Sequence, residues 1–208
     1  MAGLCVGPID RKLMMSPILN RRSVLGLGGL AMVCGGPTMA LARPAQWAVP
    51  IALDGAPNLH RVTPQLFRSA QPDAVGFANL ADLGIKTVIN LRQLVDDTPL
   101  AQGTGLILRR VKMKSRDVGE AEGAKMVQVL RDLRQGLETG PVLVHCHHGA
   151  DRTGAVMALH RILFQGWTRA EALDELINGG FGFHAVWANI PRFVAKCDLA
   201  DIKRRVMA

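Results

Sequence analysis

The sequence contains no tyrosine, and aromatic residues make up only 4% of its 208 residues. Proteins that bind single-stranded nucleic acid commonly stack bases on aromatic side chains, whereas the phenylalanines and tryptophans here are scattered singly. The basic residues between positions 109 and 116 alternate with apolar ones, as they do in a half-buried strand. We therefore expect no nucleic-acid partner, in spite of a formal net charge of +8.

Cysteine is also scarce, with four residues in the whole chain. Cys5 and Cys34 fall within the first 42 residues, so only Cys146 and Cys197 remain in the rest. Two cysteines far apart in the sequence do not make a disulfide framework. We interpret Cys197 as an ordinary thiol near the last helix. Internal repeats and low-complexity tracts are absent as well.

Residues 1–42 have the composition of an export signal. Arg21 and Arg22 precede an uncharged stretch that runs to Ala42, and the stretch ends in Ala-Leu-Ala. Charged, apolar and small-x-small segments in this order make a secretory signal peptide, and paired arginines indicate the twin-arginine route. We expect cleavage after Ala42, a periplasmic protein, and membrane contact only during export. The alternative is an uncleaved membrane anchor, because residues 24–42 are just long enough to span a hydrocarbon core of ~30 Å.

The rest of the chain suits one domain. Residues 43–57 contain three prolines and read as an extended lead-in, and the folded domain follows at residues 58–208. The apolar patterns predict strands at 66–70, 86–91, 106–113 and 142–144, and helices at 73–83, 120–137 and 153–164, with two more helices from Thr168 and from near Val186.

Two of these helices carry capping signals. Asp73 follows a proline and caps the first helix, and Thr168 with Glu171 forms a capping box. Strands that alternate with helices predict an α/β fold, with a mostly parallel central sheet flanked by helices. In such folds the ligand site lies at the carboxyl ends of the strands.

Residues 145–154 read His-Cys-His-His-Gly-Ala-Asp-Arg-Thr-Gly and join the strand at 142–144 to the following helix. Five residues separate Cys146 from Arg152, which is enough for a loop to curl around one tetrahedral oxyanion. Its amide groups form a nest, and the helix N-terminus adds positive potential. Arg152 offers a planar fork for two phosphate oxygens, and the positive field favours the Cys146 thiolate. The pattern predicts a loop that binds a phosphoryl group and attacks it.

A zinc site is the main alternative for this motif, because His145, His147 and His148 flank Cys146. Zinc ligands usually come as separated pairs from two segments, and four consecutive residues cannot all face one ion. We therefore predict no metal and no cofactor.

The motif resembles the signature of the cysteine-based protein tyrosine phosphatases, nearest to their bacterial dual-specificity-like branch. Residues 66–72 and 84–92 resemble two strands of that branch, and residues 166–173 are similar to its later helices. The likeness extends over roughly residues 58–195. It implies a single catalytic domain with a dual-specificity-phosphatase-like fold, which hydrolyses phosphomonoesters through a phosphocysteine intermediate.

Phosphate ester cleavage through cysteine needs a nucleophile, a positive cradle and an acid. Cys146 is the expected nucleophile, and the Arg152 side chain with the loop amides is the expected cradle. We expect His145 to support the loop from below and Thr153 to donate its hydroxyl to the thiolate. The remaining substrate-binding residues are those between nucleophile and arginine: His147, His148, Gly149, Ala150 and Asp151.

The general acid is expected to be Asp117. The family usually supplies an aspartate from a separate loop at about this distance upstream of the cysteine, and Asp117 follows the basic strand. Its alternative role is that of an aspartate at a helix N-terminus. Asp151 is the competing acid, since an aspartate at this loop position has that role in some phosphoinositide-cleaving relatives such as the myotubularins. Asp96 and Asp97 rank third.

The substrate stays open between two classes. The first is phosphotyrosine in proteins, with phosphoserine and phosphothreonine also accepted. The second is a phosphoinositide or inositol phosphate, because His147, His148 and the cations of residues 109–116 suit a multiply charged head group. A catalytically weak phosphate-binding module is disfavoured, since nucleophile, arginine and acid are all present. We expect a monomer.

Overall fold

The computed structural model describes residue 44 and the ranges 46–119 and 123–208. The chain divides into residues 1–40 and residues 41–208, and every element named below belongs to the second part. The predicted export signal at residues 1–42 lies outside the described residues. Within the described ranges, no helix is long and apolar enough to cross a lipid bilayer.

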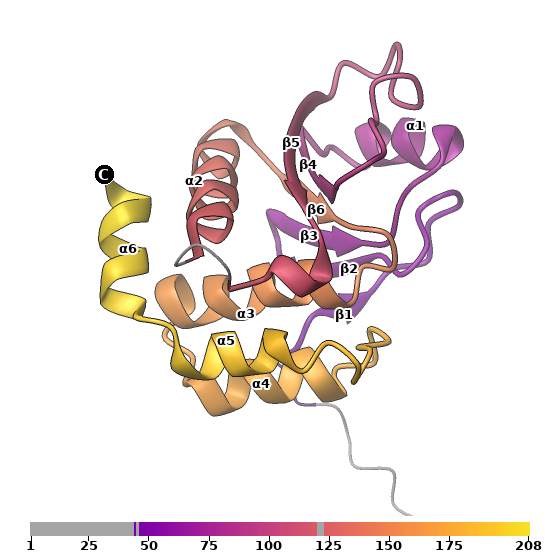
Figure 1. The fold of residues 1–208 in the computed structure, drawn as a ribbon. Coiled ribbons are helices and arrows are strands. Elements are labelled where there is room, and N and C mark those ends of the chain that lie inside the picture. The colour runs from indigo at the N-terminus through magenta and orange to yellow at the C-terminus, as the bar shows by residue number, and fades with distance from the viewer. Residues whose placement is uncertain (1–43, 45, 120–122) are drawn as a thin grey trace, which may run out of the picture. The chain divides into compact units, whose positions relative to one another are not determined.

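A six-stranded mixed sheet forms the centre of the fold, with the strand order β1-β2-β3-β6-β4-β5 (Figure 1). The strands are β1 (Val49–Pro50), β2 (His60–Thr63), β3 (Leu66–Ser69), β4 (Thr87–Arg92), β5 (Ile107–Met113) and β6 (Val142–His145). Strands β3, β6, β4 and β5 pair in parallel, while β1 and β2 extend the sheet in antiparallel pairs. This sheet confirms the predicted α/β class.

The sequence predicts neither β1 nor β2. Strand β1 has only two residues, both exposed, and β2 reads His-Arg-Val-Thr, with one apolar residue in four positions. Neither segment has an apolar run from which a strand is recognised. Strand β2 is fixed by antiparallel pairing with β3, and β1 by antiparallel pairing with β2.

Six α-helices and one short 3-10 helix complete the described fold. They are α1 (Ala74–Asp82), η1 (Ser115–Asp117), α2 (Ala124–Thr139), α3 (Asp151–Gln165), α4 (Arg169–Asn178), α5 (Asn189–Lys196) and α6 (Leu199–Met207). Both predicted caps are confirmed. The Asp73 carboxylate accepts from the Gly76 amide at 2.9 Å, and Thr168 with Glu171 forms a complete capping box.

Alternate residues of the central strands face two different core layers. On β6, Val142 and Val144 pack into a cluster that includes residues of α2 and α3. Leu143 between them packs into another cluster with Phe77 of α1. Successive strand side chains point to opposite faces, so α1 covers one face of the sheet while α2 and α3 cover the other (Figure 1). Burial on both faces is what a parallel sheet requires.

The chain after the fourth helix differs from the prediction. The prediction of a single last helix that starts near Val186 is wrong, because two helices, α5 and α6, occupy this part of the chain. Cys197 between them is extended, with φ −60° and ψ 151°. The Asp198 carboxylate then accepts from the Asp201 amide at 2.9 Å, which starts a new helix.

Helix α2 begins at Ala124, later than the predicted position 120. Gly123 before it has the left-handed φ of 72°. A right-handed helix cannot include that conformation, so Gly123 fixes the first turn. The predicted positions 120–122 lie outside the described residues.

The carboxyl ends of the four parallel strands meet at one edge of the sheet. Ser69 on β3 and Asn90 on β4 both pair with His145, the last residue of β6. Arg92 at the end of β4 pairs with Met113 at the end of β5. The segments that follow these residues therefore leave the sheet on the same side, where the sequence predicts the ligand site.

Candidate active site

The residues from Cys146 to Ala150 form the loop between β6 and α3. The Cys146 side chain is buried at its start. Gly149 has a left-handed φ of 73°, and a Cβ there would lie 2.5 Å from the Ser69 carbonyl. Glycine is thus the residue that lets the loop pass this close to β3. We refer to residues 146–152 as the phosphate loop.

Arg152 spans from the phosphate loop to the ends of β4 and β5. Its Nη1 donates to the Met113 carbonyl at 3.0 Å and to the Leu91 carbonyl at 3.4 Å. Its Nε is buried and has no hydrogen-bond partner among the described residues. Backbone carbonyls therefore hold Nη1 of the guanidinium, while Nε still needs an acceptor. A phosphate oxygen is such an acceptor.

Arg68 on β3 holds the phosphate loop from a buried position, with 1% of its surface exposed. Its Nη2 donates to the Gly149 carbonyl at 2.7 Å and to the Ala150 carbonyl at 3.5 Å, and its guanidinium lies 3.5 Å from the Phe181 ring centroid. In a trans peptide the N–H points opposite to the C=O. Arg68 therefore turns the amides that follow these carbonyls away from itself. Arg68 was not identified from the sequence.

His145 is fully buried at the end of β6 and is fixed by a carboxylate. Its Nε2 lies 2.7 Å from Asp97 Oδ2. Gln71 Nε2 donates to the other oxygen of Asp97 at 3.0 Å, and the Gln71 amide donates to the His147 carbonyl at 3.1 Å. These contacts link both ends of the His145–His147 segment to the turn after β3. The position fits the predicted supporting role of His145.

The two aspartates that rank third as acids have other contacts. Asp97 is the buried partner of His145. Asp96 accepts from the Thr98 hydroxyl at 2.6 Å and from its amide at 2.8 Å. These hydrogen bonds, together with the charge of Arg110, lower the pKa of Asp96. A carboxylate held in its charged form is poorly suited to donate a proton.

His147 is exposed on the phosphate loop and lies close to positive charge. Partial loss of water around the ring lowers the pKa of His147, and the charges of His148, Arg92 and Arg152 lower it further. The neutral imidazole is therefore favoured beside the candidate phosphate site.

Thr153 is fully buried in the first turn of α3. Its hydroxyl has no hydrogen-bond partner in the described part of the chain. Donation from this hydroxyl to the Cys146 thiolate stays a prediction.

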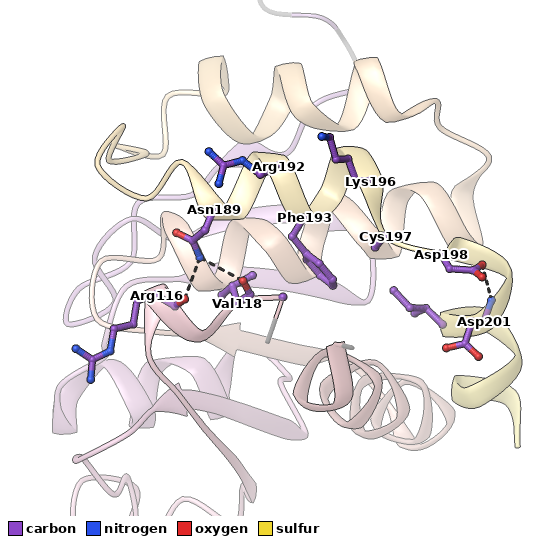
Figure 2. A pocket seen from close by; sticks show the side chains of 11 residues that line it. Arg116, Val118, Asn189, Arg192, Phe193, Lys196, Cys197, Asp198 and Asp201 are labelled. Carbon is purple, nitrogen blue, oxygen red and sulfur yellow. Dashed lines mark hydrogen bonds between the residues drawn. The ribbon is translucent and has the colours of Figure 1, made fainter. Parts of the chain in front are cut away.

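Asp117 lies on η1, directly after β5. The backbone of this turn is fixed from α5, because Asn189 Nδ2 donates to three of its carbonyls, two of which are drawn in Figure 2. The acceptors are Ser115 at 2.9 Å, Arg116 at 3.3 Å and Val118 at 3.2 Å. We call residues 114–119 the acid loop.

Phe193, one turn further along α5, packs against the end of the acid loop (Figure 2). Gly119 there has φ 93°, and a Cβ on it would come within 2.9 Å of the Phe193 ring. A cavity of about 740 Å³ borders this contact, with Asn189, Phe193 and the half-buried Cys197 in its lining. The acid loop therefore depends on residues far away in the sequence.

A cavity of about 450 Å³ brings the acid loop next to the phosphate loop. It is lined by Lys114, Ser115, Arg116, Arg152 and Trp187. Asp117 follows the lining residues on the same turn, and its carboxylate lies 3.5 Å from Arg116 Nε. The structure thus places the predicted acid on the segment that walls the cavity of the predicted arginine.

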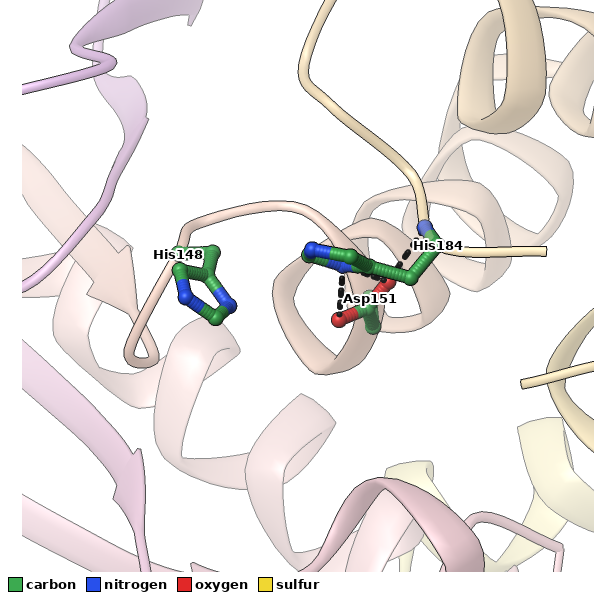
Figure 3. Close-up of side chains that lie close together, drawn as sticks. All are labelled: His148, Asp151 and His184. Atoms are coloured by element: carbon green, nitrogen blue, oxygen red, sulfur yellow. Dashed lines mark hydrogen bonds and ion pairs between the residues drawn. The ribbon is translucent and has the colours of Figure 1, made fainter. Parts of the chain in front are cut away.

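Asp151 has a different environment from Asp117. It is 3% exposed, and Oδ1 accepts from the His184 amide at 2.9 Å. His184 Nδ1 lies 3.0 Å from Oδ2 and 3.1 Å from Oδ1 (Figure 3). Both carboxylate oxygens are therefore engaged with one residue from a distant segment. His184 was not identified from the sequence.

Comparisons with known proteins agree with this geometry. The sequence model of the "Tyrosine phosphatase family" matches residues 56–184. "Dual specificity protein phosphatase TpbA" of Pseudomonas aeruginosa is 38% identical over 193 residues, which cover 90% of this chain and 85% of the relative. "Inositol diphosphatase DSP4" of Arabidopsis thaliana is 28% identical and covers 70% of this chain and 74% of its own.

The fold is similar to that of solved phosphatases. The crystal structure of a variant of P. aeruginosa TpbA in complex with pTyr matches with a TM-score of 0.70 and 33% identity, over 79% of this chain and 98% of that chain. The range matched by the family model, residues 56–184, contains the complete loop from Cys146 to Arg152. The family resemblance drawn from the motif is thereby confirmed. The chain belongs to the tyrosine phosphatase family, in its bacterial dual-specificity-like branch, and is a phosphatase of the protein-tyrosine-phosphatase type.

Proposed function

We propose that the protein hydrolyses phosphotyrosine in proteins, with Cys146 as nucleophile. The observation that carries this proposal is the cavity that joins Arg152 to Trp187 and the acid loop. An indole in the wall offers a flat apolar surface on which an aryl ring can stack. The P. aeruginosa relative, a variant of which was crystallised in complex with pTyr, supports the same substrate class.

The reaction follows from the positions of the loop groups. The Cys146 thiolate attacks phosphorus, the S–P bond forms, and the bond from phosphorus to the tyrosyl oxygen breaks. The loop amides and the unpartnered donor of Arg152 bind the equatorial oxygens as charge accumulates on them. Water then attacks phosphocysteine, releases inorganic phosphate and returns Cys146 to the thiolate. No metal takes part in either step.

Asp117 is the acid that protonates the departing tyrosyl oxygen in this proposal. It lies on the turn that walls the Arg152 cavity, and a leaving oxygen departs on the side of phosphorus opposite the thiolate. Asp151 is less suited to this role, because it is buried and both of its oxygens contact His184. In the second step Asp117, now a carboxylate, takes the proton from the attacking water.

An inositol phosphate is the second candidate substrate. Lys114 and Arg116 line the same cavity, and two cations there can bind further phosphate groups of one substrate. The A. thaliana relative named as an inositol diphosphatase supports this alternative.

A substrate panel with one variant separates the two classes. We expect the highest kcat/KM for phosphotyrosine peptides, lower values for phosphoserine and phosphothreonine peptides, and the lowest for inositol phosphates. Trp187→Ala removes the aromatic wall and should reduce kcat/KM for phosphotyrosine peptides more than for phosphoserine peptides. Higher activity on inositol phosphates, lost on Lys114→Ala and unaffected by Trp187→Ala, would overturn the phosphotyrosine assignment.

We further propose that the protein is exported and that the mature chain begins at Arg43. The paired Arg21 and Arg22, the uncharged run and the Ala-Leu-Ala sequence support this location. Mass spectrometry of fractionated cells should find a periplasmic form that starts at Arg43. An intact N-terminus in the cytosol or in the membrane would overturn the proposal. Conversion of Arg21 and Arg22 to lysine should stop export if the twin-arginine route is used.

A further inference from the structure

Three side chains with metal-binding chemistry meet at the rim of the phosphate loop. His148 and Asp151 belong to the loop, while His184 comes from the segment before α5 (Figure 3). One donor atom from each of the three lies within 4.8 Å of the other two. We propose that His148, Asp151 and His184 form a binding site for a divalent transition-metal ion, with zinc as the best-suited ion.

The donor set and its spacing suit zinc. Two imidazoles and one carboxylate are ligands that zinc accepts, at bond lengths of about 2.0–2.2 Å. Tetrahedral geometry with such bonds places neighbouring donors about 3.3 Å apart. His184 Nδ1 and the Asp151 oxygens are already 3.0 and 3.1 Å apart. An ion between these two groups can therefore take the place of their hydrogen bond, and the His148 donor lies within 4.8 Å of both.

Asp151 is held ready as a ligand. It is a carboxylate with 3% exposure, and the His184 backbone amide donates to its Oδ1 at 2.9 Å. That hydrogen bond fixes the orientation of the carboxylate without using the imidazole. In metal sites, hydrogen bonds of this kind from surrounding groups orient the residues that bind the metal.

The two segments that carry the ligands are joined by a separate residue. Asn58 Nδ2 donates to the His148 carbonyl at 2.8 Å and to the Phe181 carbonyl at 3.0 Å. Asn58 has a left-handed φ of 55°, which is uncommon for a residue other than glycine. The backbone positions of His148 and of the segment that leads to His184 are thus set without any ion.

This site differs from the zinc alternative rejected for the motif alone. Residues 145–148 are consecutive and cannot all face one ion, whereas His184 supplies a ligand from a second, distant segment. His147, whose ring centroid lies 4.3 Å from that of His148, is not part of the donor cluster.

A bound ion would tie the phosphate loop to the segment before α5. Its three protein ligands leave one tetrahedral position for water or an anion. The nucleophile Cys146, the arginine Arg152 and the proposed acid Asp117 are not among the three ligands, so metal binding can be measured in a variant that lacks the nucleophile.

Isothermal titration calorimetry with Zn²⁺ tests the proposal on the full chain carrying Cys146→Ser, which removes the thiolate as a competing ligand. We expect one tight site. In that background His148→Ala and His184→Gln should each weaken binding at least about tenfold. His184→Gln retains a donor for Asp151, so the fold is expected to persist, and thermal unfolding without metal checks this.

His147→Ala is the matched control, because it removes a neighbouring exposed imidazole from the same loop. It should leave zinc affinity unchanged. Co²⁺ provides a second readout: the visible absorption of a tetrahedral ion should appear in the Cys146→Ser chain and be lost with His184→Gln. The proposal is overturned if His184→Gln binds zinc as tightly as its parent, or if His147→Ala weakens binding as much as His148→Ala. Activity of the wild-type enzyme in a chelator tests the proposed hydrolysis independently.

Discussion

The phosphate loop and the acid loop are built in different ways, although both lie at the carboxyl edge of the same sheet. Cys146 and Arg152 are six positions apart on one continuous segment, and the helix α3 follows at once. The acid loop is held through three backbone carbonyls by Asn189, which lies 71 to 74 positions away in the sequence. The phosphate loop is therefore encoded by a contiguous sequence motif, whereas the acid loop is positioned by tertiary contacts.

This difference predicts how each loop responds to substitution. Changes of Cys146 or Arg152 in the phosphate loop alter the groups that attack and bind phosphorus, so they should remove activity whatever the substrate. Changes around the acid loop alter only the delivery of a proton. Their effect should therefore grow as the leaving group becomes more basic.

The largest effect is expected from the phosphate loop itself. Cys146→Ser should show no measurable turnover and still bind phosphate or vanadate, because a serine hydroxyl does not ionise there. Arg152→Lys should also fail, since an ammonium group cannot make the bidentate contact. Steady-state kinetics and phosphate-protected thermal unfolding measure the two properties. Substantial turnover by the serine variant would contradict the nucleophile assignment.

Asp117→Asn should reduce turnover by ~10²–10⁴-fold, the usual contribution of a positioned acid. The loss should be large for alkyl phosphates and small for aryl phosphates with good leaving groups. Asp151→Asn is the matched control, because it removes the charge of the other candidate. A series of phosphate esters with increasing leaving-group pKa gives the comparison.

The opposite result has a clear form. If Asp151→Asn shows the leaving-group dependence and Asp117→Asn does not, the acid lies in the phosphate loop. The two loops would then not divide the chemistry between them. The inositol phosphate alternative would gain support from that outcome.

A smaller effect is expected from Asn189→Ala, which removes the donor to the acid loop. One hydrogen bond contributes a net stabilisation of about 0.5–1.5 kcal/mol. We therefore expect kcat to fall by about tenfold for substrates with poor leaving groups. Good leaving groups should be affected little, a pattern that simple destabilisation would not produce. Asn178→Ala is the control, since among the described residues the Asn178 side chain donates to Asp174 of the same helix α4 and not to the acid loop. Equal losses on both kinds of ester would contradict a positioning role.

The smallest effect concerns α3, the helix that extends from the phosphate loop. Burial, together with the nearby charge of Arg161, lowers the pKa of His160 to about 4. The unfolded chain therefore binds a proton near pH 6.5, whereas the folded chain stays neutral until about pH 4. Stability should fall as pH decreases through this window, by at most ~1.4 kcal/mol per pH unit. We expect the free energy of unfolding of His160→Gln, measured with urea at several pH values, to depend less steeply on pH than that of the wild type. An unchanged pH dependence would exclude His160 as the cause.

Much of the fold could be predicted from the sequence where the signal is local. The apolar runs gave β3 to β6 within a residue or two at their ends, and Asp73 and Thr168 marked two helix starts. The strands β1 and β2 could not be predicted, because these short segments become strands only through tertiary pairing, β2 with β3 and β1 with β2. The break between α5 and α6 was missed although Asp198 is a good capping residue, because apolar periodicity continues across it.

The same distinction applies to the candidate site. The motif identified Cys146 and Arg152 because their roles depend on spacing along one loop. Arg68, Asn189 and His184 were missed, because each acts through a residue far away in the sequence. The one available signal was Arg68 itself, a charged residue inside a strand that is otherwise suited to burial.

The most direct test of the proposed mechanism is to trap the intermediate. The enzyme is mixed with a phosphotyrosine peptide, quenched in acid within the first turnover, digested and analysed by mass spectrometry. We expect one phosphoryl group on Cys146, and Asp117→Asn should increase its share if breakdown of the intermediate slows more than its formation. Phosphorylation of His147 or His148 with an unmodified Cys146 would show that Cys146 is not the nucleophile.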